Sequence, residues 1–404
     1  MFKKTRSKGI DFISFFLILS IFSKELFSIN IGGVSVDLFS YTFFTIYFFF
    51  HVHKFKLPKE YFLLFIILFF SSIISILIFK YEFESFFKVF IPIVIIFSSS
   101  YDIIFKRMDN LFSMFNFYLK TTYFVAIFGL IQWSLSLIGV NIIINQPGLL
   151  DSIAYEPSHY AVIVSPAALY YLKNFKKNKI TSIIINLSLI LTFSFTAYFT
   201  ILVALLISFL NFRNILKLVF SIFLFVFLFN FFPDRVKDRW DSLINLVISK
   251  KDFRDSSTNL TTMSFVSNFE VAIFSIRKNF LTGAGLGMNK YLYDEYYSND
   301  NYFQSHRHYG INSQASHSLT LRIISELGLF GIIIYVLFIN KNYIKLTKSN
   351  RIYHIISLAI LTHFLAKTIK LSGYIDYGTP IFVAFLLINK LHYKLNKQKV
   401  INNI

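Results

Sequence analysis

Apolar runs as long as a membrane is thick constrain this chain more than any other sequence feature. The window YFLLFIILFFSSIISILIF at 61–79 is an example. A helix of about 20 such residues spans the hydrocarbon core of a bilayer. Charged residues make up only 15% of the chain, whereas soluble domains carry about 25%. The sequence therefore predicts an all-α integral membrane protein.

Hydropathy predicts about twelve transmembrane helices. They are expected at 10–29, 34–52, 61–80, 84–100, 111–139, 158–172, 180–194, 197–211, 215–232, 317–340, 352–371 and 375–391. The seventh and eighth are short, and we interpret them as a hairpin that turns near Phe195 and Thr196. A single tilted helix is the alternative, and it would invert the topology of everything downstream.

The distribution of basic residues supports the hairpin. The net charge is +19, which on its own could indicate a nucleic-acid partner. With twelve spans and both termini in the cytoplasm, the cytoplasmic segments hold 22 of the 40 basic residues. This is the positive-inside asymmetry, which places basic residues on the cytoplasmic side of the membrane, so we expect no nucleic-acid partner.

The segment 233–316 is the longest polar stretch, and this topology places it on the outer side. It contains ten basic and nine acidic residues, begins with PDRVKDRWDSL and ends in a Tyr-rich stretch at 291–314. The first part suits an amphipathic helix and the second a loop. The expected organisation is a bundle of nine spans at 1–232, this large extracytoplasmic loop at 233–316, and three spans with a basic tail at 317–404. Long ordered loops are usually functional.

Ionisable residues inside predicted spans are candidates for a site, because they are costly in a membrane. Arg322 and Glu326 are four residues apart and share a helix face. They form either a structural pair or part of an outward-facing cationic cavity, where the guanidinium would bind phosphate. Lys367 and Lys370 lie near the outer end of the eleventh span, where they either snorkel to the interface or bind an anion.

Two residues at the starts of predicted spans are candidate bases. Glu156 precedes Pro157, which suits the first turn of a helix. The carboxylate either only caps that helix or accepts a proton from a sugar hydroxyl at the membrane surface. His317 opens the tenth span, where histidine is more often an interface residue than a catalyst. It lies nine residues before Glu326, on roughly the opposite face, so the two are not expected to share one site.

The run NFLTGAGLGM at 279–288 is too weak a pattern for a dinucleotide site, because no soluble βαβ unit surrounds it. We expect a tight turn whose backbone N–H groups face outward. Arg277, just upstream, would bind phosphate or pair with Glu270. The HxH at His306 has no regular metal-ligand spacing, so no metal is expected.

Four segments together resemble the O-antigen polymerase and O-antigen ligase superfamily of bacterial membrane proteins. They are YEPSHYA at 155–161, LTFSFTAYFTIL at 191–202, NFLTGAGLGM at 279–288 and HSLTLRIISELGLFG at 317–331. Ser318 stands where the family usually has Asn, and Thr282 replaces a Pro. Phe195 replaces an arginine of the hairpin, which puts a role of the hairpin in phosphate binding in doubt. YEPSHYA favours a polymerase over a ligase.

The resemblance implies a glycosyltransferase at the outer leaflet of the bacterial plasma membrane. Its substrates would be oligosaccharide repeat units on undecaprenyl pyrophosphate, polymerised without metal or cofactor. Besides membrane lipid, the partners it implies are a chain-length-determining co-polymerase and a flippase. The implied roles are base for Glu156 or His317, pyrophosphate binding for Arg277, Arg322, Lys367 and Lys370, and glycan contacts for His159, Glu326 and Tyr374. The tyrosines of the large loop would stack on sugars. The alternatives are a ligase acting on lipid A-core, a lipid-linked oligosaccharide flippase or other transporter, and a membrane O-acyltransferase.

Overall fold

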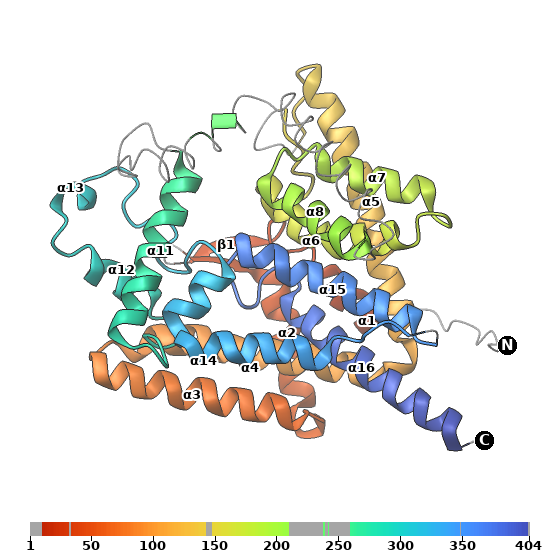
Figure 1. The fold of residues 1–404 in the computed structure, drawn as a ribbon, viewed down its shortest axis with the longest axis horizontal. Coiled ribbons are helices and arrows are strands. Elements are labelled where there is room, and N and C mark those ends of the chain that lie inside the picture. Colours follow the sequence, from red (N-terminus) through yellow and green to blue (C-terminus); the bar gives the residue numbers. More distant parts are fainter. Residues whose placement is uncertain are drawn as a thin grey trace.

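The computed structural model describes residues 10–31, 34–142, 148–209, 237–238, 241, 259–347 and 349–402. Nearly all of the regular structure in these residues is helical (Figure 1). In chain order the elements are α1 (Phe12–Leu19), β1 (Ser28–Ile31), β2 (Val34–Asp37), α2 (Leu38–His51), α3 (Lys59–Phe79), α4 (Phe83–Lys106), α5 (Leu111–Leu137), α6 (Pro157–Lys173), α7 (Lys179–Ile190), α8 (Phe195–Phe209), α11 (Leu260–Lys278), α12 (Asn289–Tyr296), α13 (Asn301–Gln304), α14 (Leu319–Asn342), α15 (Arg351–Ile369) and α16 (Thr379–Asn402). Short 3₁₀ helices occupy Val52–Lys54 and Met108–Asn110.

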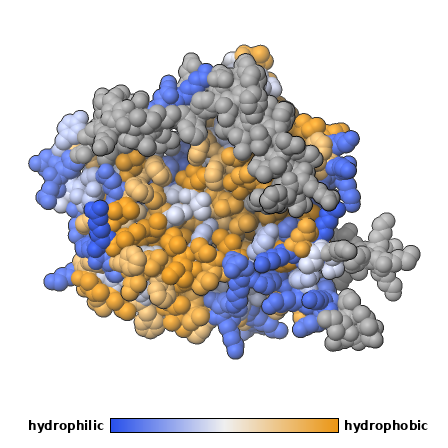
Figure 2. All heavy atoms as spheres, in the orientation of Figure 1, coloured by the Kyte–Doolittle hydropathy of each residue, from blue (hydrophilic) through white to orange (hydrophobic). Residues whose placement is uncertain are grey.

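Among the described residues, five helical segments are long and apolar enough to cross a membrane. They are α3, α4, Met108–Leu137, α14 and α15. Apolar residues cover the middle of the face in Figure 2, and hydrophilic residues gather at its left edge and lower right. The chain is a helical membrane protein, as predicted. The number of twelve transmembrane spans stays a prediction. The predicted span 215–232 lies outside the described residues.

The predicted span 10–29 is wrong in its bounds, and the predicted span 34–52 begins four residues before the helix that it contains, α2. Helix α1 has 8 residues, about 12 Å of helix, and the chain then enters an antiparallel hairpin that pairs Ser28 with Asp37. Asp37 ends β2 and caps α2 by accepting a hydrogen bond of 3.0 Å from the Ser40 backbone N–H. An apolar strand and an apolar helix have similar mean hydropathy. The hydropathy window therefore did not distinguish the β1–β2 hairpin from the helices on either side of it.

The segment after α6 forms two helices, as predicted, and not one tilted helix. Helix α7 ends at Ile190 and α8 begins at Phe195, so the turn comes a few residues earlier than expected. Phe193 has a left-handed backbone (φ 45°). The carbonyl of Leu191 accepts a hydrogen bond of 3.0 Å from the Leu150 N–H, which ties the turn to the segment that leads into α6.

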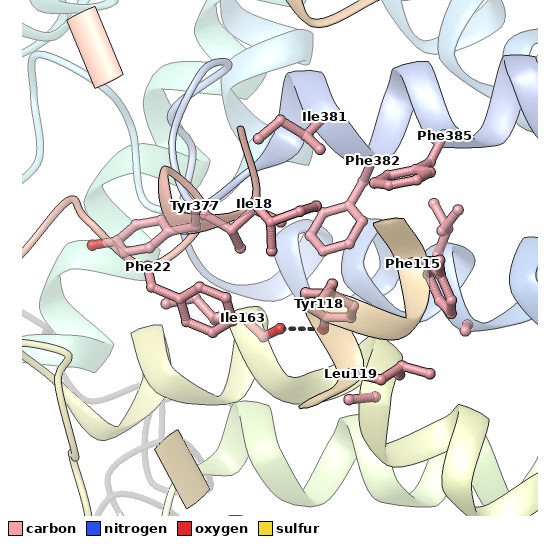
Figure 3. Close-up of a cluster of buried hydrophobic side chains, with 14 of the residues drawn as sticks. Ile18, Phe22, Phe115, Tyr118, Leu119, Ile163, Tyr377, Ile381, Phe382 and Phe385 are labelled. Atoms are coloured by element: carbon pink, nitrogen blue, oxygen red, sulfur yellow. Dashed lines mark hydrogen bonds between the residues drawn. The ribbon is translucent and has the colours of Figure 1, made fainter. Parts of the chain in front are cut away.

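The largest buried cluster joins α1, α5, α6 and α16 (Figure 3). Tyr118 is fully buried and donates a hydrogen bond of 2.7 Å to the carbonyl of Ile163. A buried tyrosine hydroxyl needs such a partner. The ring of Phe382 meets that of Tyr118 edge to face, with 5.3 Å between centroids. Helix α6 also packs against α15 and α8, so the start of α6 is held from several sides.

The end of the predicted large loop is an ordered, partly helical unit packed on α14. Helix α11 lies against α14, and α12 and α13 follow it at the left of Figure 1. Tyr293, Tyr297 and Phe303 are buried and contact one another, with 4.7 Å between the last two rings. The prediction of a loop was wrong for Asn289–Tyr296 and Asn301–Gln304, which are helical, whereas the residues between and after them form turns. Tyr293 and Tyr297 build a small core and are too buried to stack on a sugar. Most of PDRVKDRWDSL lies outside the described residues.

Candidate functional site

A cavity of about 460 Å³ lies where the ends of several helices meet. Its wall includes Glu156 at the start of α6, His317 before α14 and Lys370 after α15. Hydroxyl residues from the α7–α8 turn, the start of α8 and the start of α11 also line it, as do two from α6 and α15: Thr192, Ser194, Thr196, Thr261, Thr262, Ser158 and Thr368. The structure thus brings together both predicted bases and one of the four predicted pyrophosphate-binding residues.

Glu156 precedes α6 in an extended conformation, with Pro157 as the first helical residue. Its carboxylate does not cap the helix but turns towards other side chains. Oε2 accepts a hydrogen bond of 3.1 Å from the Ser158 hydroxyl and lies 3.7 Å from both Lys370 Nζ and His159 Nε2. Capping alone therefore does not account for Glu156, whose side chain is 37% exposed in the cavity wall.

His317 is buried in the turn before α14, with 5% of its surface exposed. Its Nδ1 lies 3.0 Å from the hydroxyl of Ser264, and Phe265 packs edge-on against the ring. Burial, together with the nearby Lys370 ammonium, lowers the pKa of His317 to about 3. The imidazole is therefore neutral at physiological pH.

Lys370 reaches the cavity because the segment after α15 runs beside the segment before α14. Ser318 and Leu371 form an isolated parallel bridge, and the Ser372 hydroxyl donates to the carbonyl of Ser316 at 3.0 Å. Leu371 adopts a left-handed conformation (φ 71°), which ends the extended stretch. This pairing places the ammonium in the wall near His317.

Arg322 occupies a different, buried cluster with Glu326 and Tyr374. Its Nε donates to Glu326 Oε1 at 3.1 Å, and its guanidinium lies 4.4 Å from the centre of the Tyr374 ring. The Tyr374 hydroxyl donates to Glu326 Oε2 at 3.0 Å. None of the three is among the described residues that line the cavity. This geometry matches the structural pair that the sequence analysis kept as an alternative.

Two further predicted cations lie apart from the cavity. Lys367 is fully buried, and its ammonium donates to the carbonyl of Gly373 and to Thr379 Oγ1, the latter at 2.7 Å. It therefore holds the α15–α16 loop together. Arg277 is exposed near the end of α11, 15 residues beyond Thr262, which corresponds to about 22 Å along the helix.

The glycine motif does not present its backbone N–H groups to a ligand, and this prediction was wrong. Ala284 N–H donates to the carbonyl of Ser325 at 2.9 Å and Gly285 N–H to that of Glu326 at 2.8 Å. Gly283 has φ 63°, and a Cβ there would lie 2.7 Å from the backbone of Glu326. The motif lets its own backbone pack directly against the kink in α14 at Gly328, whose backbone is non-helical.

A polar network that was not predicted from the sequence lies behind Glu156. Glu25 Oε1 lies 3.0 Å from His159 Nδ1, and the hydroxyl of Tyr377 contacts both side chains. Beside it, Lys24 pairs with Asp376 at 2.6 Å. His159, predicted to touch glycan, thus links this network to Glu156. The available signal was a pair of adjacent charges, Lys24 and Glu25, directly after an apolar run.

Comparison with known proteins agrees with the resemblance found in the sequence. No curated protein and no solved structure matches the chain. Residues 180–336 match the family model described as O-antigen ligase. This segment contains the α7–α8 hairpin, the glycine motif and His317, whereas Glu156 and Lys370 lie outside it. The match covers less than half of the chain and is consistent with the resemblance to the O-antigen polymerase and O-antigen ligase superfamily of membrane proteins.

Proposed function

We propose that the chain polymerises oligosaccharide repeat units carried on undecaprenyl pyrophosphate at the outer leaflet of the plasma membrane. The observation that carries the proposal is the convergence of Glu156, His317 and Lys370 on one cavity. All three lie at helix ends that the predicted topology assigns to the outer side. About 460 Å³ is within the usual range of about 300–1,000 Å³ for ligand sites.

The chemistry needs a base and a stabilised leaving group. The hydroxyl of the acceptor sugar would give its proton to the Glu156 carboxylate while its oxygen forms a bond to the anomeric carbon of the donor glycan. The bond from that carbon to the carrier pyrophosphate breaks, and both electrons leave with the phosphate oxygen. Lys370 would stabilise the negative charge that develops there, since fixed cations at such a position lower the barrier. The hydroxyls of Ser194 and Thr196, which line the cavity, would hydrogen-bond the phosphate oxygens in place of the arginine that Phe195 replaces.

Glu156→Gln tests the base, because it keeps the shape of the side chain and removes its ability to accept the proton. Polymer formation in a strain lacking the wild-type protein should fall by about 10²–10⁴-fold, the usual contribution of a general base. Glu84→Gln is the matched control, since Glu84 is also paired with a lysine (2.6 Å to Lys88), but its side chain is 68% exposed and does not line the cavity. Normal polymer ladders from Glu156→Gln at wild-type protein level would contradict the assignment.

A ligase is the second candidate, because the family model that matches residues 180–336 is described as O-antigen ligase. The same base and cation would then transfer finished glycan to lipid A-core. Gel analysis of a deletion strain separates the two functions. Loss of a polymerase leaves core capped by a single repeat unit, whereas loss of a ligase leaves core without any glycan.

A further inference from the structure

The hydroxyl of Ser264 lies between two side chains behind His317. Asn312 Nδ2 donates to Ser264 Oγ at 2.7 Å, and Ser264 Oγ lies 3.0 Å from His317 Nδ1. Ser264 is in α11 and is buried, so within the described residues these two contacts account for its hydroxyl. The three side chains form a short chain of hydrogen bonds that ends on the imidazole.

The directions of these hydrogen bonds determine which nitrogen of the His317 ring carries the proton. An amide nitrogen only donates, so Ser264 Oγ is the acceptor in its bond with Asn312. A hydroxyl oxygen can accept two hydrogen bonds, but if Nδ1 also donated to it, the buried proton of Ser264 would have no acceptor among the described residues. The proton is therefore directed at Nδ1 of His317, which accepts it. In a neutral imidazole one nitrogen carries the proton and the other accepts, so the proton of His317 is on Nε2.

The nitrogen that carries this proton is the one not bonded to Ser264. Nδ1 points to Ser264, and Phe265 covers one edge of the ring. His317 nevertheless contributes to the cavity wall, and in the described part of the chain no hydrogen bond occupies Nε2. The N–H group is therefore the part of the ring that is available to a ligand.

We propose that Ser264 and Asn312 are positioning residues that hold His317 as its Nε2–H tautomer, so that it donates a hydrogen bond to an anionic oxygen of the substrate. On this assignment His317 is not the base, and that role is left to Glu156. Together with Lys370, the imidazole N–H provides a donor for the pyrophosphate oxygens. The role in the reaction rests on the proposed function, but the tautomer does not.

The tautomer is measured directly by nitrogen NMR of the full-length protein in lipid nanodiscs with ¹⁵N-labelled histidine. The signals of His317 are identified by their loss in His317→Gln. The expected spectrum has a protonated Nε2 and an unprotonated Nδ1 at neutral pH, with no substrate present. A protonated Nδ1 in the wild-type protein would overturn the proposal.

Asn312→Asp provides the matched perturbation. Asp fits the left-handed backbone of residue 312 (φ 56°) about as well as Asn, but its carboxylate only accepts. It should draw the Ser264 proton away, so that Ser264 accepts from Nδ1–H and the tautomer reverses. Ser264→Thr keeps the hydroxyl and should keep the wild-type tautomer.

The activity of these variants separates the two proposals. Loss of one preorganised donor typically lowers the rate by about 10²–10³-fold. Asn312→Asp should therefore lose polymer by at least about 10²-fold, while Ser264→Thr stays near wild type. A reversed tautomer with full polymer formation would overturn the donor role. Full polymer formation in Glu156→Gln would instead overturn the proposed function and leave the tautomer assignment standing.

Discussion

Substitution of Gly283 by Ala decides whether the glycine motif packs against α14 or binds a ligand. Gly283 has φ 63°, and an added Cβ would lie 2.7 Å from backbone atoms of Glu326 and Gly328. Backbone atoms in a packed contact cannot turn aside as the end of a flexible side chain does. The whole contact between the motif and α14 would have to separate.

The cost has two parts, and the chain offers a control that isolates one of them. A left-handed backbone costs a non-glycine residue about 1–2 kcal/mol, and Gly139→Ala should show only this cost, because φ is 86° there and nothing lies within 4 Å of the added Cβ. Overpacking adds about 1–3 kcal/mol. Gly283→Ala should therefore destabilise by about 2–5 kcal/mol in total.

The free energy of unfolding of both variants can be compared by denaturant titration of the purified protein in mixed micelles. Gly283→Ala is expected to be less stable than Gly139→Ala by about 1–3 kcal/mol, the overpacking cost alone. Equal stability of the two variants, with polymer formation lost only in Gly283→Ala, would refute the packing argument. The motif would then have to act on the substrate directly.

Three further predictions test the charges. Lys370→Met should lower polymer formation strongly at unchanged protein level, whereas the exposed Lys88→Met should not, as read from gel ladders and immunoblots. Arg322→Ala should lower the protein level, because a buried Glu326 without its partner costs about 3–5 kcal/mol. The double variant Arg322→Met with Glu326→Met should restore the protein level. Loss of polymer in that stable double variant would show that Arg322 acts directly in the reaction. His317 has a folded pKa of about 3, below the ordinary 6.5, so protons bind preferentially to the unfolded chain and this contribution to stability is lost as pH falls from about 6.5 to 3. The unfolding free energy of His317→Gln should therefore fall less steeply over that range than that of the wild type.

The sequence predicted those parts of the fold that depend on local composition. Long apolar runs specify helices in a membrane because every backbone group must be satisfied within the segment. The hairpin between α7 and α8 followed from charge counting. The β1–β2 hairpin did not, because a strand and a helix of apolar residues have the same mean hydropathy.

The sequence indicated individual candidate residues of the site, but not which of them lie together in the folded protein. Glu156 and His317 stand at helix starts, which sequence patterns reveal. Arg322 either faces a cavity or pairs with Glu326. Which of the two occurs depends on what packs against that face of α14, and this includes Tyr374, 52 residues away along the chain. Glu25 was missed for a related reason, since nothing local indicates that the turn after α1 lies against His159 and Tyr377.

The α15–α16 loop explains why the site appears only in the folded chain. Within residues 370–378, Lys370 faces Glu156, Tyr374 covers Arg322 and Tyr377 contacts Glu25 and His159. One loop thus connects the turn after α1, the start of α6 and the start of α14. The segment that matches the family model supplies His317 and the hydroxyl-lined turn, but not this loop or Glu156. Glu156, which we assign as the base, and Lys370, which we assign as the cation, therefore lie outside the matched segment. Residues that decide between the acceptor of a polymerase and that of a ligase should be sought in these outside segments.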